Sequence, residues 1–167
     1  MKSLSAPHLA IALAALVAPV LLPCARAQGP GTDIPAGCAV RDHVPPAELG
    51  GEWQVSLGEL GSPPERVRDQ GQLRLERHPE YTDGVRGPLL LGRGGQMRSS
   101  QVSGDVIDGE FHLDESEDGR TISAVWSGRA LQCAGQLMIT GTRRPAEGID
   151  APDPALAFRL TRVPGWR

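Results

Sequence analysis

Three short stretches of the sequence gather residue types that could do chemistry. The first is His78-Pro79-Glu80-Tyr81, which brings together an imidazole, a carboxylate and a phenol. A loop of this kind can donate ligand contacts or a general base when it lies at the mouth of a pocket. Three polar residues beside a proline are also an ordinary connection between strands. We therefore take His78, Glu80 and Tyr81 as candidate ligand contacts and assign no catalytic residue.

The second stretch carries polar side chains at every other position. Glu110, His112 and Asp114 share one face of a strand if the segment is extended. Two carboxylates and an imidazole at this spacing could hold a metal ion. Outward strand positions are polar by default, however, so a solvated face is the stronger interpretation. We expect no metal site here.

The third stretch, residues 114–119, begins like a calcium-binding loop. Asp114, Ser116 and Asp118 occupy the first, third and fifth positions of such a loop. The twelfth position is Val125, where the loop needs a bidentate glutamate. The segment therefore favours an acidic hairpin turn.

Other chemistries lack their signatures. Ser99, Ser100 and Ser103 have no G-x-S-x-G context and no placed histidine and aspartate partners. Zinc spacing, a phosphate-binding loop and a dinucleotide fingerprint are also missing from the sequence. We expect a protein that is not an enzyme and that binds no cofactor.

The N-terminus is typical of a secretory signal peptide. Lys2 precedes an uncharged apolar run over residues 9–22, and Ala25-Arg26-Ala27 predicts cleavage after Ala27. The run of 14 residues is shorter than the about 20 needed to span a bilayer. Lipid attachment at Cys24 is the second-ranked alternative, because Pro23 stands where a small residue is expected. We expect a periplasmic or secreted protein without a membrane span.

Removal of residues 1–27 changes the charge and the cysteine count. Lys2 and Arg26 leave, so the formal net charge moves from −3 to −5 over 140 residues. An acidic chain without a basic cluster argues against a nucleic-acid partner. Cys38 and Cys133 remain, and in an exported chain they predict a disulfide. Closing a loop of this size stabilises a fold by roughly 4 to 5 kcal/mol in the chain-entropy model.

The mature sequence predicts an all-β fold with an N-terminal coil arm. Residues 28–49 are rich in Gly and Pro, with a helical turn at 47–49, and alternation of apolar and polar residues begins at Glu52. We expect strands near residues 52–57, 71–77, 84–91, 97–104, 109–116, 121–128, 131–141 and 156–162. Eight such strands need closure, so we expect a small antiparallel up-and-down barrel over residues 50–163 and a tail over 164–167.

The alternation also predicts which side chains point into the barrel. The inward set is Trp53, Val55, Leu57, Leu73, Leu75, Val85, Leu89, Leu91, Phe111, Leu113, Ile122, Ala124, Trp126, Leu131, Cys133, Leu137, Ile139, Leu156, Phe158 and Leu160. Hairpin turns are expected at Asp83-Gly84, Asp108-Gly109 and Asp118-Gly119, since Asp-Gly readily adopts positive φ. Pro88 suggests a bulge or an edge.

The segment Gly51-Glu52-Trp53 at the head of the first strand resembles the start of lipocalin and avidin-like barrels. In lipocalins a short helical turn precedes this tryptophan, and a cation from the last strand packs across it. The resemblance gives those roles to residues 45–49 and to Arg162, and implies that Trp53 plugs the barrel base. The Thr-Asp turn that lipocalins place between strands six and seven is replaced here by residues 127–130. In outline the chain is also similar to small periplasmic protease inhibitors, which join an eight-stranded barrel to an arm and one disulfide.

Two functions follow from these resemblances, and we rank the binding protein first and the interaction protein second. A lipocalin-like binding protein would hold a small apolar or amphipathic ligand inside the barrel, with Trp53, Phe111, Trp126 and Phe158 as pocket residues. It predicts a connected cavity beside Trp53 and Trp126. An interaction protein, such as a protease inhibitor or an envelope partner, would use its arm and loops, and it predicts a tightly packed barrel.

Overall fold

The computed structural model describes residues 34–149 and 154–165. The predicted signal peptide, Cys24 and the end of the predicted tail lie outside these residues. The elements are β1 (Cys38–Val40), α1 (Pro46–Leu49), β2 (Gly51–Glu59), β3 (Asp69–Arg77), β4 (Val85–Arg93), β5 (Gln96–Ile107), β6 (Glu110–Ser116), β7 (Ala124–Cys133), β8 (Gln136–Pro145) and β9 (Leu156–Arg162).

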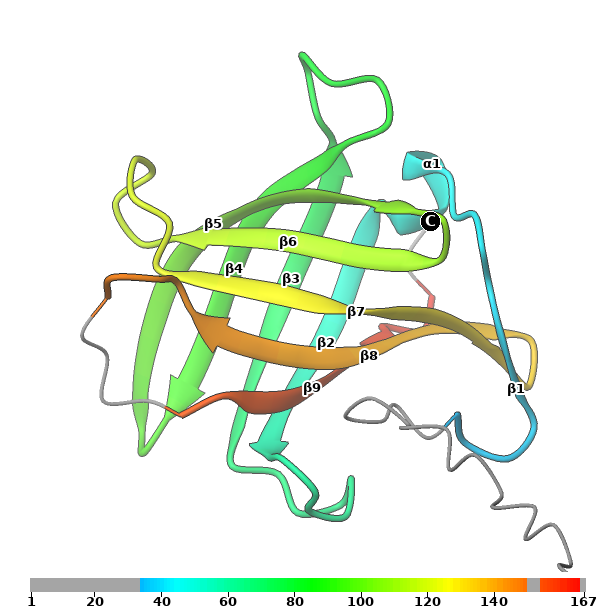
Figure 1. The fold of residues 1–167 in the computed structure, drawn as a ribbon, viewed down its shortest axis with the longest axis horizontal. Coiled ribbons are helices and arrows are strands. Elements are labelled where there is room, and N and C mark those ends of the chain that lie inside the picture. Colours follow the sequence, from blue (N-terminus) through cyan, green and yellow to red (C-terminus); the bar gives the residue numbers. More distant parts are fainter. Residues whose placement is uncertain (1–33, 150–153, 166–167) are drawn as a thin grey trace, which may run out of the picture. The chain divides into compact units, whose positions relative to one another are not determined.

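Eight of these strands close into an antiparallel barrel (Figure 1). Each strand from β2 to β9 pairs with the next one along the chain, and β9 returns to pair with β2. Closure pairs every strand on both sides, which removes the exposed edges of an open sheet. The predicted up-and-down eight-stranded barrel is confirmed.

The two ends of the barrel hold different residues. At the end where β2 begins and β9 finishes, Trp53 pairs with Arg162, and we call this the Trp53 end. The opposite end holds the buried polar residues Asp69, Ser100 and Glu115, and we call it the Glu115 end. Figure 1 shows α1 and the β3–β4 loop at the Trp53 end, and the β2–β3 loop at the other.

The alternation of the strands fills the barrel with apolar side chains. On β2, for example, Trp53, Val55 and Leu57 are buried while Gln54 is exposed. Most of the predicted inward residues belong to the one buried core cluster. β5 reads as polar on both faces in the sequence, yet it runs from Gln96 to Ile107 because it is paired along its length with β4 and β6.

The boundary between β7 and β8 was predicted wrongly. The sequence placed a connection near residues 129–130, but β7 continues to Cys133 and turns at Ala134-Gly135. Both turn residues have positive φ, 46° and 81°, as the tight hairpin turns that match strand twist require. Ala130 therefore faces inward, and Leu131 and Cys133 face outward rather than into the barrel, although Leu131 is buried as predicted, at 1% exposed.

Three other local predictions need correction. Ile122 lies before β7 and is 42% exposed. Of the three Asp-Gly pairs, only Asp108-Gly109 forms a two-residue hairpin turn; the others lie in loops over residues 78–84 and 117–123. Pro88 makes neither an edge nor a bulge, because β4 pairs with both neighbours and the β3–β4 register is the same on either side of it.

The arm is tied to the outside of β7. The predicted disulfide is confirmed: Cys38 and Cys133 are joined, with their Cα atoms 4.2 Å apart. β6 pairs with β7 as far as Arg129, and β1 takes the neighbouring place at residues 131–133. The arm therefore contains a short strand as well as coil. The predicted helical turn is present as α1, which begins at Pro46, a residue favoured in the first turn of a helix.

A row of four residues across β6 to β9 lets these strands bend tightly. Phe111 pairs with Gly128, Gly128 with Gly141, and Gly141 with Phe158. A methyl group on Gly128 would collide with the Thr140 carbonyl oxygen and come within 2.9 Å of Phe158 Cζ. The Phe158 ring thus occupies the space above Gly128, a known way of stabilising glycine within sheets.

Candidate functional site

Trp53 is enclosed at its end of the barrel. Its indole is fully buried, and its Nε1 donates a hydrogen bond to the Leu49 carbonyl oxygen at 2.9 Å. The Arg162 guanidinium lies 4.8 Å from the centroid of the indole ring. Burial lowers the pKa of Arg162, and the negative charge of Glu48 acts in the opposite direction. Trp53 therefore packs between α1 and a partly desolvated cation, in the arrangement that the lipocalin resemblance implies.

The other three predicted pocket residues meet in the middle of the barrel. The ring centroid of Phe158 lies 5.0 Å from that of Trp126 and 5.9 Å from that of Phe111. None of the three is more than 3% exposed. These distances are those of tilted aromatic pairs in a packed core. The rings fill the space that a ligand would need.

Glu115 carries a buried charge at its end of the barrel, where Asp69 is also buried. It is 3% exposed, and its carboxylate accepts hydrogen bonds from Ser100 Oγ (3.1 Å), Trp126 Nε1 (2.9 Å) and Arg143 Nε (2.8 Å). The Arg143 guanidinium also lies 5.8 Å from the Trp126 ring centroid. Three donors thus satisfy a carboxylate that burial alone would disfavour.

This network was missed at the level of sequence, although alternation contains the signal. Inward positions recur at every second residue, so the series Phe111 and Leu113 continues at Glu115 on β6. On β8 the series that includes Ile139 reaches Arg143 after two such steps. A carboxylate and a guanidinium at inward positions of neighbouring strands of a barrel predict a buried pair.

A pocket of about 40 Å³ lies beside this network. Its lining includes Leu57, Leu91, Arg98, Ser100, Glu115 and Arg143. A volume of this size holds a few water molecules, whereas small-molecule sites usually enclose roughly 300 Å³ or more. The interior therefore offers no room for a sizeable ligand in this conformation.

The His78 loop lies away from that pocket. β3 runs from Asp69 at the Glu115 end to Arg77, so the loop that follows is at the Trp53 end. His78 Nδ1 accepts hydrogen bonds from the backbone N–H groups of Glu80 and Tyr81, both at 3.2 Å, and the rings of His78 and Tyr81 are 4.5 Å apart. The three candidates are close together, and the imidazole lone pair holds the loop, while Glu80 and Tyr81 also line an open surface pocket of about 550 Å³.

The acidic stretches form surface structure. Glu110 Oε2 and His112 Nε2 are 3.5 Å apart on the outer face of β6. Asp118 accepts backbone hydrogen bonds from Thr121 and Arg120, which lower its pKa to about 2, and one from Ser116 Oγ. Among the residues that the structure describes, no three His, Cys, Asp or Glu side chains form a group that could hold a metal ion.

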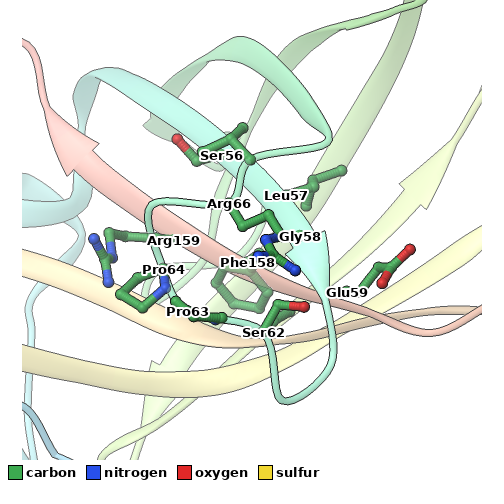
Figure 2. Close-up of a pocket in the computed structure, with 12 residues that line it drawn as sticks. Ser56, Leu57, Gly58, Glu59, Ser62, Pro63, Pro64, Arg66, Phe158 and Arg159 are labelled. Carbon is green, nitrogen blue, oxygen red and sulfur yellow. The ribbon is translucent and has the colours of Figure 1, made fainter.

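A second pocket, of about 110 Å³, lies outside the barrel, under the β2–β3 loop (Figure 2). We call it the loop pocket. Its walls come from the outer faces of β2 and β9 and from the loop, which contributes Pro63, Pro64 and Val67. Arg66 of the loop and Arg159 of β9 also line it. Sequence reasoning did not find this pocket, since it needs the pairing of β2 with β9.

Comparison with known proteins adds no family. No protein-family model matches the chain, and no curated protein is similar to it. Within residues 34–149 and 154–165, no helix is long and apolar enough to cross a membrane. The closed eight-stranded antiparallel barrel is compatible with a calycin-type fold.

Proposed function

We propose that this chain is an exported, non-catalytic binding barrel that recognises another protein through its outer surface. The observation that carries the proposal is the filled interior. Phe111, Trp126 and Phe158 occupy the centre of the barrel, and the pocket beside Glu115 measures only about 40 Å³. A barrel that is closed on its own core leaves its loops, arm and outer face for recognition.

The first part of the proposal is that the protein is exported. The signal-like segment with cleavage after Ala27 supports it, and so does the Cys38–Cys133 disulfide, because such bonds persist in oxidising compartments. The disulfide holds the arm against β7. An arm fixed in this way can present a constant surface to a partner, which lowers the entropy cost of binding.

Native mass spectrometry of the exported protein, compared with its denatured mass, tests the proposal. We expect a denatured mass for residues 28–167 less two hydrogen atoms, which the disulfide accounts for, and a native protomer that carries no small molecule. A lipid-sized increase in the denatured mass would instead indicate a lipid attached to Cys24, and it would overturn export as a soluble protein. A tightly held adduct of small-molecule mass would overturn recognition of a protein as the main function.

A small polar ligand at the Glu115 end is the second candidate. Arg98 and Arg143 line the same pocket as the Ser100 hydroxyl, three leucines and three carboxylates (Asp69, Glu115 and Glu117), which favours a small ligand with a polar head and an apolar body. An adduct in the native spectrum that disappears in Arg98→Gln would support this candidate. An adduct unaffected by that substitution would place the ligand elsewhere.

A further inference from the structure

We propose that the loop pocket binds the C-terminal residue of a partner polypeptide, with its apolar side chain inside the pocket and its carboxylate on Arg66 and Arg159. This inference rests on the proposed function and adds the chemistry of the partner. It uses four properties of the pocket: its size, its walls, its charge and the order of the loop above it.

The size of the pocket matches one side chain. Its volume of about 110 Å³ is below the roughly 300 Å³ at which small-molecule sites begin. A single buried side chain in a pocket is, in contrast, the usual anchor of a protein interface. Pro63, Pro64 and Val67 of the loop line the pocket together with Ala157 of β9, so its walls favour an apolar anchor.

The charge around the pocket is positive although the chain as a whole is acidic. Arg66 and Arg159 line the pocket together with one carboxylate, Glu59, whereas the full chain has a formal net charge of −3. In the described part of the chain, neither arginine forms an ion pair within 4.0 Å. Both guanidinium groups are therefore available to a ligand carboxylate, which arginine binds with paired hydrogen bonds.

A C-terminal residue combines the two groups that this pocket fits. Inside a polypeptide, an apolar side chain and a carboxylate belong to different residues. At the C-terminus a single residue carries both, within the reach of a pocket that accommodates one side chain. Capture of a terminal carboxylate is also an established mode of peptide recognition.

The loop is held in place before any partner arrives. Backbone hydrogen bonds join Ser62 N to Glu59 O (3.1 Å), Arg66 N to Pro63 O (2.9 Å) and Arg68 N to Leu57 O (2.7 Å). Gly58 allows the loop to approach β2, since a Cβ there would lie 3.0 Å from the Arg66 carbonyl oxygen. A pocket formed in advance loses little entropy when it binds.

Titration of the disulfide-bonded protein with short peptides, followed by amide NMR, tests the inference. The probe is the pentapeptide Ala-Ala-Ala-Ala-Leu with a free carboxylate, and the matched controls end in Leu-amide and in Lys. We expect shifts at Gly58, Ser62 and Val67 with a Kd of about 0.1 to 1 mM, the range for one anchoring residue. The amide should bind at least about tenfold more weakly, because one charge-assisted contact typically supplies a tenfold step. The Lys peptide keeps the carboxylate, but it should also bind at least about tenfold more weakly, because it loses the buried apolar side chain and brings a positive charge to two arginines.

Substitutions test whether Arg66 and Arg159 bind the carboxylate of the peptide. Arg159→Gln and Arg66→Gln should each weaken binding of the free-acid peptide several-fold, while Arg144→Gln on the exposed face of β8 should leave it unchanged. Equal binding of the acid and the amide, shifts that lie outside the loop pocket, or no shift at about 10 mM peptide would each overturn the site. None of these results would overturn the proposed function, which fails separately if the native protein carries a small molecule.

Discussion

At the scale of single residues, the ion pair between Glu115 and Arg143 predicts a large loss of stability when one partner is removed. Arg143→Gln removes the cation and leaves a carboxylate that is 3% exposed with two neutral donors, Ser100 and Trp126. Breaking a buried pair in this way costs about 3 kcal/mol or more. Arg144→Gln, at the neighbouring exposed position, should change the free energy of unfolding by less than about 0.5 kcal/mol. Urea denaturation of both variants measures the contrast.

A double substitution separates charge from packing in the same experiment. Glu115→Leu with Arg143→Met removes both charges and keeps similar volume, so its loss should be much smaller than that of Arg143→Gln alone. A double variant as unstable as the single one would mean that Arg143 acts by filling space, and the interpretation as a charge pair would be wrong.

Asp118 gives the clearest pH dependence. The backbone N–H groups of Thr121 and Arg120 lower its pKa from the ordinary 3.8 to about 2. A lowered pKa means that the carboxylate stabilises the folded state above pH 3.8 and loses this contribution as the pH falls through about 2. NMR titration of the side-chain carboxyl should find its midpoint near pH 2. A midpoint near the ordinary value of 3.8 would contradict the turn seen here.

At the scale of elements, the arm depends on the disulfide while the barrel does not. The barrel closes through β2 and β9, and the arm adds only β1 and the bond from Cys38 to Cys133. The double variant Cys38→Ser/Cys133→Ser should therefore keep the strand signal in circular dichroism. It should lose roughly 4 to 5 kcal/mol of unfolding free energy, because the bond closes a loop of 95 residues. Loss of all strand signal under native conditions would show that the barrel needs the arm in order to fold.

Gly128 is the element-scale test of the tight bend across β6 to β9. Gly128→Ala drives a methyl group into the Thr140 carbonyl and toward Phe158, and should destabilise the fold by about 2 to 3 kcal/mol. Gly92→Ala on β4 is the matched control, because its methyl group meets the movable end of Met97 at 3.0 Å. Thermal unfolding of the two variants should differ accordingly. Equal midpoints would mean that the strands can bend without Gly128.

The same glycine explains where sequence reasoning about the strands failed. Period-2 alternation located all eight barrel strands, because one buried face per strand is what a closed barrel requires. Gly128 in mid-strand looked like the end of an element, so the sixth strand was ended too early and the parity of Leu131 and Cys133 was reversed. A glycine that bends a strand and a glycine that ends one have the same local sequence signal. Only the pairing with Gly141 distinguishes them.

At the scale of the whole chain, the residues of the packed core were easier to predict than those of the loop pocket. Trp53, Phe111, Trp126 and Phe158 were found because large apolar residues at inward positions must be buried. The loop pocket was not found, because its walls come from residues 56–67 and 157–159, which become neighbours only when the barrel closes. Sequence alternation specifies one face of each strand. It does not specify which outer faces come together.

The filled interior itself can be tested on the whole protein. Phe158 lies between Phe111 and Trp126, so Phe158→Ala should cost about 3 to 5 kcal/mol and leave an apolar cavity in the middle of the barrel. An apolar cavity of this kind stays dry and binds benzene-sized molecules. Benzene should therefore raise the melting temperature of Phe158→Ala and leave that of the natural protein unchanged. An equal rise in the melting temperature of the natural protein would reveal an interior that opens to ligands. It would favour binding of a small ligand over recognition of another protein. The comparison is informative because both proteins share the same barrel and differ only in the side chain of Phe158, which fills its centre.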